Sequence, residues 1–217
     1  MKQFVTFPFS LYKNNKYWVP PIIKDEVDNF DPEKNPVFEN ADAQFFVAIR
    51  NGEIVGRVAA IVNWFEVEKQ QIKKMRFGWF DVINDIEVSK VLLEKVKEIG
   101  LKNKLEYIEG PVGFNNLDKT GVLVEGFDHI GTMITWYNHP YYKEHLEALG
   151  AESQLIMFMT GAGGSGKSNV IAAFYAYCKE FCLNLNASFD SRTIVITPIT
   201  RAVTTSIIWE KQLAPKH

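Results

Sequence analysis

The sharpest chemical signal in the sequence is a glycine-rich stretch that ends in Lys167 and Ser168. It satisfies Gly-x-x-x-x-Gly-Lys-Ser in full, with the apolar run 155–159 before it and a helical pattern from Asn169 to about Phe181 behind it. Backbone N–H groups of such a loop curl around phosphates, and the next helix adds its dipole. Lys167 would reach the β- and γ-phosphates of ATP, and the Ser168 hydroxyl would bind Mg²⁺. The predicted phosphate-binding residues are Gly161, Gly163, Gly164, Ser165, Gly166, Lys167 and Ser168.

A second group of side chains suited to proton transfer lies between residues 125 and 145. Glu125, Tyr137, Tyr141 and His145 are of the types that serve as general acids or bases. A structural interpretation competes with this one, because the tyrosine pair after Pro140 also fits packing at a helix start and His145 fits a partly exposed helical position. No residue is therefore predicted to be catalytic, and both interpretations stay open.

The remaining reactive or aromatic side chains indicate packing. Cys178 and Cys182 are the only cysteines, which excludes a disulfide framework, and their spacing in a helical pattern predicts buried thiols. A metal site there would need two further ligands, and no histidine has the required spacing. Four tryptophans could wall a ligand cleft, although core filling is the commoner use of each. They are Trp18, Trp64, Trp79 and Trp136.

The composition limits the classes of protein to consider. The 217 residues, 47% apolar and 23% charged, suit a globular chain with one domain or slightly more. A net charge of −2 supplies no overall basic field for a nucleic-acid backbone. Residues 1–10 lack the features of a signal peptide, and no stretch reaches the roughly 20 apolar residues of a membrane helix. We expect a cytoplasmic location and no membrane partner.

The first third of the chain predicts a helix followed by a hairpin. Phe4, Phe7 and Leu11 keep helical spacing, and the segment 17–21 then reads as a rigid extended piece. Apolar runs at Gln44–Arg50 and Glu53–Val62 flank Asn51-Gly52, a dipeptide that tolerates the positive φ angles of a tight turn. This hairpin is the firmest structural prediction.

The next part predicts alternating strands and helices. Met75–Val82 reads as a strand, and Asn84 is predicted to cap a helix with Glu87 reaching back. That helix would end at Gly100 or soon after. Strands are expected at Leu105–Ile108 and Thr132–Tyr137, and a last helix from Pro140 to Gly150. The predicted apolar face of the first helix comprises Val88, Val91, Leu92, Val96 and Ile99. This order predicts a mixed α/β (α+β) fold with a mostly antiparallel sheet and flanking helices.

Several short motifs in residues 1–153 occur in an order that resembles a bacterial group of GNAT-like proteins, relatives of acetyl-CoA-dependent N-acetyltransferases. The motifs are Phe9-x-Leu11-Tyr12-Lys13, Tyr17-Trp18-Val19-Pro20-Pro21, Asn35-Pro36-x-Phe38, Gly110-Pro111-x-Gly113-Phe114, Gly126-Phe127-Asp128 and Tyr137-Asn138-x-Pro140-Tyr141-Tyr142. The resemblance implies an acyl-CoA-dependent N-acyltransferase scaffold, with acetyl-CoA as cofactor and a small acyl or amine substrate as partner. A degenerate relative that only binds such a ligand is equally compatible.

Two departures from the family pattern bear on catalysis. The family carries a Gln/Arg-x-x-Gly-x-Gly/Ala turn that binds the coenzyme A pyrophosphate, but the corresponding stretch, Ile83–Glu87, has no glycine. Asp85 and Glu87 also place carboxylates where a helix start would face an anion. The family's frequent general-acid tyrosine corresponds to Leu146. We expect this bend to reject a diphosphate.

Residues 154–217 resemble a different family, the opening of PIF-type DNA helicases. The similarity rests on the Walker A segment from Gln154 to Ile171, and then on Thr193–Thr197 and Thr204–Ile207 as the next strand and helix. The family's Thr-Gly-x-Ala-Ala departs here to Thr200-Arg201-Ala202-Val203-Thr204. The acidic strand end and the arginine that a working ATPase needs are not present in the sequence. The small excess of basic residues is too weak to argue for DNA binding.

Two domains are therefore predicted: residues 1–153, GNAT-like, and residues 154–217, a truncated P-loop strand-loop-helix-strand-helix unit. The second cannot cover both faces of a parallel sheet alone, so we expect 155–159 to join the sheet of the first. Three functions stay open: an N-acyltransferase or degenerate relative fused to an ATP-binding segment, an ATP-binding helicase fragment without unwinding activity, and a non-catalytic fusion remnant.

Overall fold

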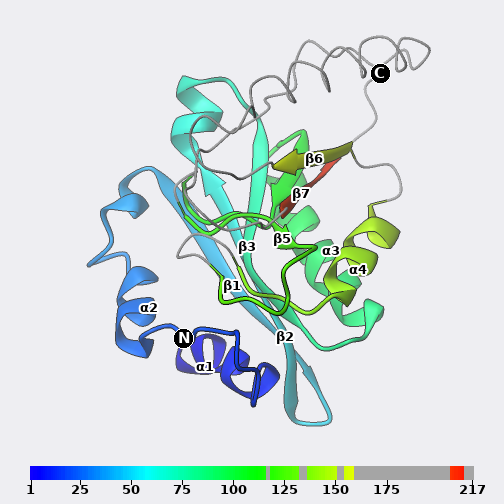
Figure 1. The fold of residues 1–217 in the computed structure, drawn as a ribbon. Helices are drawn as coiled ribbons and strands as arrows, with labels where there is room; N and C mark the ends of the chain where they lie inside the picture. The colour runs from blue at the N-terminus through cyan, green and yellow to red at the C-terminus, as the bar shows by residue number, and fades with distance from the viewer. Residues whose placement is uncertain (116–117, 132–135, 151–153, 159–205, 213–217) are drawn as a thin grey trace, which may run out of the picture.

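The fold is a twisted sheet with helices on both faces (Figure 1). The computed structural model describes residues 1–115, 118–131, 136–150, 154–158 and 206–212. Its strands are β1 (Ala41–Arg50), β2 (Glu53–Asn63), β3 (Lys74–Val82), β4 (Tyr107–Gly110), β5 (Val122–Leu123), β6 (Gln154–Phe158) and β7 (Ser206–Gln212). Its helices are α1 (Lys2–Leu11), α2 (Ile23–Asn29), α3 (Ile86–Lys102) and α4 (Tyr141–Leu149), with a 3₁₀ turn, η1 (Pro36–Glu39), and a π turn, η2 (Phe65–Lys69).

The sheet is mostly antiparallel, as the sequence predicts. Its order is β1-β2-β3-β4-β7-β5, with β6 paired to β7. Of the strand pairs within the described residues, β3–β4 is the parallel one, and α3 provides the crossover between its two strands. The mixed α/β class is therefore confirmed.

The predicted hairpin is confirmed at its turn and in its register. β1 and β2 pair antiparallel from Ala41↔Asn63 to Arg50↔Glu53. Asn51 and Gly52 both have positive φ, 53° and 84°. Since Asn and Gly adopt this conformation most readily, the dipeptide sets the turn and the turn sets the register.

Alternation along β2 creates a separate core on each face of the sheet. Val58, Ala60 and Val62 pack with α3 and α4, while Ala59 and Ile61 pack with α1. Full burial of a side chain of this kind contributes about 1.5–3 kcal/mol. The α1 face is strongly aromatic, with buried Phe4, Phe30, Trp79 and Phe114.

Helix α3 begins one residue later than the sequence suggests. Asp85, not Asn84, is the N-cap, and its side chain accepts a hydrogen bond from the backbone N–H of Glu87. The helix ends at Lys102, just after the predicted stop at Gly100. On the predicted apolar face Val91 is 59% exposed, whereas Ser89 and Leu93 are buried in its place.

Helix α4 agrees with the sequence, with Pro140 at its N-cap and Gly150 at its C-cap. Most of the expected strand at 132–137 lies outside the described residues, and Trp136 and Tyr137 are not in a strand. The short strand β5 was not expected.

The predicted docking of 155–159 is wrong in its pairing. The partner of β6 is β7, and β7 itself takes the place beside β4. The helix expected at 204–207 is also wrong where it is described, because Ser206 and Ile207 belong to β7. β7 pairs antiparallel with β4, from Tyr107↔Gln212 to Gly110↔Trp209, and with β6, so it stands between β6 and the sheet of the first 153 residues. The phosphate-binding loop 161–168, Cys178 and Cys182 lie outside the described residues.

Candidate functional site

A β-bulge in β3 decides which side chains reach the α1 face. Ala59 pairs with Gly78 and Arg57 pairs with Asp81, so two residues of β3, Trp79 and Phe80, oppose a single residue of β2. Trp79 adopts a φ of 45°, in the left-handed region that a tryptophan rarely enters. One extra residue reverses the facing of everything after it. The bulge therefore moves Asp81 from the α3 core to the α1 face.

Asp81 is the centre of a buried polar cluster on that face. Its Oδ2 accepts hydrogen bonds from Nε of Arg57 at 2.7 Å, with Nη2 of Arg57 also at 2.7 Å. Its Oδ1 accepts a hydrogen bond from the hydroxyl of Tyr12 at 2.7 Å. Arg57 further donates from Nη1 to the carbonyl of Phe4 at 2.8 Å. The cluster ties β2, β3 and α1 together beneath a surface cleft.

The cleft above Asp81 has a volume of about 400 Å³. We call it the aromatic cleft, because aromatic and proline side chains supply most of its wall. Residues from the α1–α2 connection, from β2 and β3 and from the segment before α4 line it: Pro8, Tyr17, Trp18, Val19, Pro20, Pro21, Glu26, Arg57, Asp81, Lys119, Gly131, Trp136 and Tyr137. Apolar walls with a few polar groups at the base are typical of small-molecule sites.

The aromatic walls are fixed by contacts between distant parts of the chain. Tyr12 stacks on Trp18 at 5.3 Å between ring centroids and meets Tyr137 edge-on at 5.7 Å. The hydroxyl of Tyr137 accepts a hydrogen bond from Asn15 at 2.8 Å and donates to the carbonyl of Phe127 at 3.2 Å. The wall residues Trp18 and Tyr137 are therefore held in place by contacts with residues outside the cleft lining.

Charged side chains at the cleft fall into a paired and an unpaired set. Arg57 and Asp81 neutralise one another at the base. Glu26, from α2, is half-buried and accepts a hydrogen bond at Oε2 from the indole N–H of Trp79 at 3.0 Å. Lys119 places Nζ 4.9 Å from the ring centroid of Trp136. Glu26 and Lys119 are thus the charges open to a ligand.

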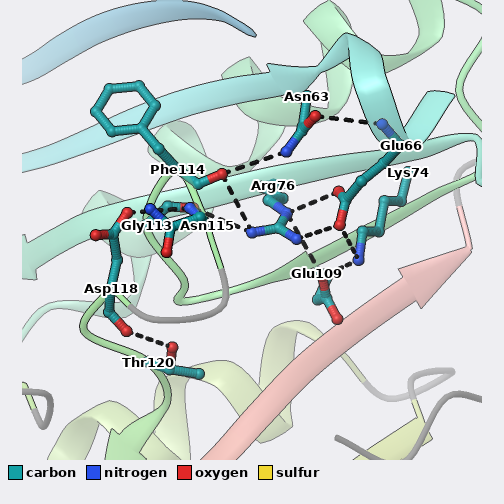
Figure 2. Close-up of polar contacts among 10 residues, drawn as sticks. All are labelled: Asn63, Glu66, Lys74, Arg76, Glu109, Gly113, Phe114, Asn115, Asp118 and Thr120. Carbon is teal, nitrogen blue, oxygen red and sulfur yellow. Dashed lines mark hydrogen bonds and ion pairs between the residues drawn. The ribbon is translucent and has the colours of Figure 1, made fainter. Parts of the chain in front are cut away.

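A buried ionic network holds the backbone at Gly113 and Phe114, shortly before Lys119 in the sequence (Figure 2). Arg76, which is 1% exposed, binds the Glu66 carboxylate through Nε and Nη2 and donates from Nη1 to the carbonyls of Gly113 and Phe114, each at 3.4 Å. Glu109 completes the network, 2.8 Å from the Lys74 ammonium.

The same segment is also closed on itself. Asp118 accepts a hydrogen bond from the backbone N–H of Asn115 at 3.0 Å, and its own carbonyl accepts one from Thr120 at 2.9 Å. Lys119 lies between Asp118 and Thr120, the two residues that the second bond joins. The network is therefore a structural support for one wall of the aromatic cleft.

The start of α3 carries two carboxylates, Asp85 and Glu87, in the bend that the sequence predicts to reject a diphosphate. Asp85 is hydrogen bonded by Arg50 Nη1 at 2.6 Å, and this bond holds the pKa of Asp85 below its ordinary value. The Asp85 carboxylate also accepts a hydrogen bond from the backbone N–H of Glu87, which is then not available to a ligand. A charged cap of this kind stabilises the helix and repels a diphosphate.

The acid and base candidates from the sequence serve different purposes in the structure. Glu125 is exposed and outside the cleft lining, while Tyr137 lines the cleft. Tyr141 donates to the carbonyl of Val82 at 2.7 Å. His145 is 6% exposed, so its expected partial exposure is wrong.

The burial of His145 has a clear structural reason. Its Nδ1 lies 2.8 Å from the hydroxyl of Ser89, which is fully buried on α3. Burial lowers the pKa of His145, which favours the neutral ring. With no described route to a ligand, this pair joins α3 to α4 and does not form a nucleophilic dyad at the cleft.

Sequence reasoning missed four polar residues of the cleft: Glu26, Arg57, Asp81 and Lys119. The motifs around Tyr12, Trp18 and Tyr137 pointed to the right region, and among the tryptophans the cleft interpretation holds for Trp18 and Trp136. Trp79 is 4% exposed and fills the core, as expected. Leu146 is buried and offers no acid.

Metal and membrane signals are absent from the described part of the chain. No group of three or more His, Cys, Asp or Glu side chains there could hold a metal ion. Among the same residues no helix has the length and apolar character to cross a bilayer. Ser168, the predicted Mg²⁺ ligand, lies outside the described residues.

Two curated proteins are similar to this chain in sequence. Protein YghO of Escherichia coli (strain K12) is 32% identical over 151 residues, which cover 69% of this chain and 38% of that protein. Bacterial ceramide synthase of Caulobacter vibrioides is 25% identical over 173 residues, 79% of this chain and 45% of that protein. The chain thus spans less than half the length of either relative. No family model matches it.

Solved structures with a similar arrangement are acetyltransferases. A GNAT-family acetyltransferase from Staphylococcus aureus has a TM-score of 0.46 and 14% identity, with 98% of this chain and 92% of that one covered. A ribosomal-protein-alanine N-acetyltransferase from Brucella melitensis has a TM-score of 0.47 and 8% identity, with coverages of 98% and 96%.

Proposed function

We propose that the chain is a GNAT-like N-acyltransferase domain whose aromatic cleft receives the amine acceptor of an acyl-CoA-dependent reaction. In that reaction the amine nitrogen attacks the thioester carbonyl and the C–S bond breaks, and the departing thiolate of coenzyme A takes up the proton that the nitrogen loses. The carrying observation is the cleft itself: an apolar, aromatic space of about 400 Å³ with carboxylates from α2 and β3.

Two further observations support this proposal. The motifs in residues 1–153 resemble GNAT-like proteins, and one protein similar in sequence is a bacterial ceramide synthase. Both relatives extend well beyond the matched region, so the whole protein's activity need not reside in this part. Because the acid-capped start of α3 repels a diphosphate, acyl-CoA would have to place its diphosphate elsewhere on the chain.

The test is a thiol-release assay on the full chain with a long-chain acyl-CoA and a primary amine. Release of coenzyme A that depends on the amine is the expected result. Trp18→Ala removes one wall of the cleft and should raise the KM for the amine. The absence of amine-dependent release with both substrates at millimolar concentration would contradict the proposal.

A second candidate function rests on one specific observation, the complete Walker A pattern at 161–168. We propose that this loop binds ATP and Mg²⁺, with Lys167 on the phosphates and Ser168 on the metal. Binding of ATP·Mg²⁺ that is lost on Lys167→Ala would support it, and binding unaffected by that change would remove the proposed role of the lysine. Helicase activity is not part of this proposal.

A further inference from the structure

Glu26 is the cleft carboxylate that no described cation neutralises. Asp81 is bound by Arg57 through two nitrogens, whereas the described contact of Glu26 is the hydrogen bond from the neutral indole of Trp79. That bond engages Oε2 and leaves Oε1 on the same side chain for a ligand. A half-buried carboxylate of this kind favours a cationic partner, because its own charge is partly desolvated.

Trp79 is held so firmly that it fixes the direction of Glu26. Its backbone adopts the φ of 45° at the bulge, and its ring packs against Phe30 at 4.9 Å, Phe114 at 5.3 Å and Trp136 at 5.6 Å between centroids. Backbone strain of this kind persists only where surrounding contacts enforce it, and it clusters at functional sites. The bulge thus places the indole N–H of Trp79 where it donates to the Glu26 carboxylate and orients it.

The wall beside Glu26 already holds a cation. The ammonium of Lys119 lies 4.9 Å from the Trp136 ring centroid, within the distance at which an aromatic face attracts a positive charge. Trp136 in turn contacts Trp79, the donor to Glu26. An aromatic face and a carboxylate at adjoining positions are the groups that recognise an ammonium ion.

The rest of the cleft offers an apolar path to solvent. Val19, Pro20 and Pro21 line it, and Val19 is 59% exposed. The adjoining Ile22 is 68% exposed and continues the apolar surface. A ligand that matches both features carries an ammonium group at the inner end and an apolar chain at the outer end.

We propose that Glu26, oriented by Trp79, binds the ammonium group of a primary amine carried on an apolar chain. This inference rests on the proposed function, and it names the acceptor class and the residue that selects it. Glu26 is a binding residue here. The alternative ligand is an anion held by Lys119, which the same cleft would recognise through the opposite charge.

The experiment titrates three ligands with the same eight-carbon chain into the full chain of the protein by calorimetry: octylamine, octanol and octanoate. Octylamine should bind about tenfold more tightly than octanol, as expected for one charge-assisted hydrogen bond. Glu26→Gln should reduce octylamine to the affinity of octanol, while its amide oxygen can still accept the Trp79 N–H. Trp79→Phe should weaken octylamine less than Glu26→Gln does.

Two matched variants make the outcome decisive. Asp25→Asn removes the same charge from the same helix but outside the cleft lining, and should leave octylamine binding unchanged. Lys119→Ala should tighten octylamine binding, because it removes a positive charge from the lining of the same cleft. Octanoate binding more tightly than octylamine, with loss on Lys119→Ala, would overturn the proposal, as would octylamine binding unaffected by Glu26→Gln.

The two proposals fail in different ways. Octylamine binding that needs Glu26, without any thiol release by the unmodified chain, would leave the ammonium site standing and refute acyl transfer. Amine-dependent thiol release that is the same in Glu26→Gln as in the unmodified chain would refute the role of Glu26 and leave acyl transfer standing. Thermal unfolding of each variant checks that the fold is retained.

Discussion

The hydroxyl of Tyr12 donates a 2.7 Å hydrogen bond to Oδ1 of Asp81, and so joins the C-terminal end of α1 to the C-terminal end of β3. Burial, and then the charge of Asp81, raise the pKa of Tyr12 well above its ordinary value. The hydroxyl therefore stays protonated and acts as a donor. Asp81 is left as the acceptor for both Tyr12 and Arg57.

Asp81→Asn should destabilise the fold by about 3–5 kcal/mol, because it leaves the Arg57 charge buried without its partner. The two side chains are only 5% and 7% exposed. The measurement is urea unfolding. Glu98→Gln, which breaks the exposed pair with Lys95, is the control and should change little. A loss below about 1 kcal/mol for Asp81→Asn would mean that Arg57 finds another partner.

The position of Asp81 shows where sequence reasoning stops. A regular strand over Met75–Val82 places Asp81 on the same face as Met75 and Phe77, in the apolar α3 core. The bulge at Trp79 reverses the face on which Asp81 lies. No local sequence pattern predicts this bulge, because the backbone strain at a φ of 45° is balanced by ring contacts from distant segments. The hairpin at Asn51-Gly52 was predictable because its cause is local.

The candidate site was predictable only in part for the same reason. Motif resemblance pointed to the neighbourhood of Trp18 and Tyr137, which line the cleft. No sequence pattern pointed to Glu26, since helix α2 was not expected and the hydrogen bond between Glu26 and Trp79 joins residues 53 positions apart in the chain. The N-cap of α3 is Asp85 and not the predicted Asn84, because the Asp85 carboxylate also binds Arg50 of the neighbouring hairpin.

Tyr142→Phe should cost more stability than Tyr141→Phe. The Tyr142 hydroxyl accepts the backbone N–H of Val82 at 2.8 Å and is 3.1 Å from that of Tyr12, all in a buried region. Its removal leaves a buried donor unpaired, which costs about 1–3 kcal/mol. Tyr141 is half-buried and donates to the carbonyl of Val82, which Tyr142 also reaches at 3.3 Å. Equal urea midpoints for the two variants would contradict this.

Gly78→Ala should destabilise the fold by about 1–3 kcal/mol, the usual range for overpacking. A Cβ there would lie 2.5 Å from the carbonyl oxygen of Val112, whose N–H donates to the carbonyl of Phe77 at 2.7 Å. The segment that follows carries Lys119, so the variant should also change tryptophan fluorescence in the cleft. Gly52→Ala is the comparison variant: its site is open, so any loss there reports backbone strain at the φ of 84° and not overpacking. Unchanged stability in Gly78→Ala would mean that the segment shifts freely.

His145→Gln should remove part of the pH dependence of stability below neutral pH. Burial lowers the pKa of His145 in the folded chain below the ordinary 6.5, so protons bind the unfolded chain preferentially as pH falls. The contribution of the neutral ring is fully present above pH 6.5 and is lost as pH falls from 6.5 through the lowered folded-state pKa. Urea midpoints at pH 7.5 and pH 5 measure the loss, which should be smaller in His145→Gln, since a glutamine can still reach the Ser89 hydroxyl. A variant at position 145 that keeps the original pH dependence would contradict the prediction.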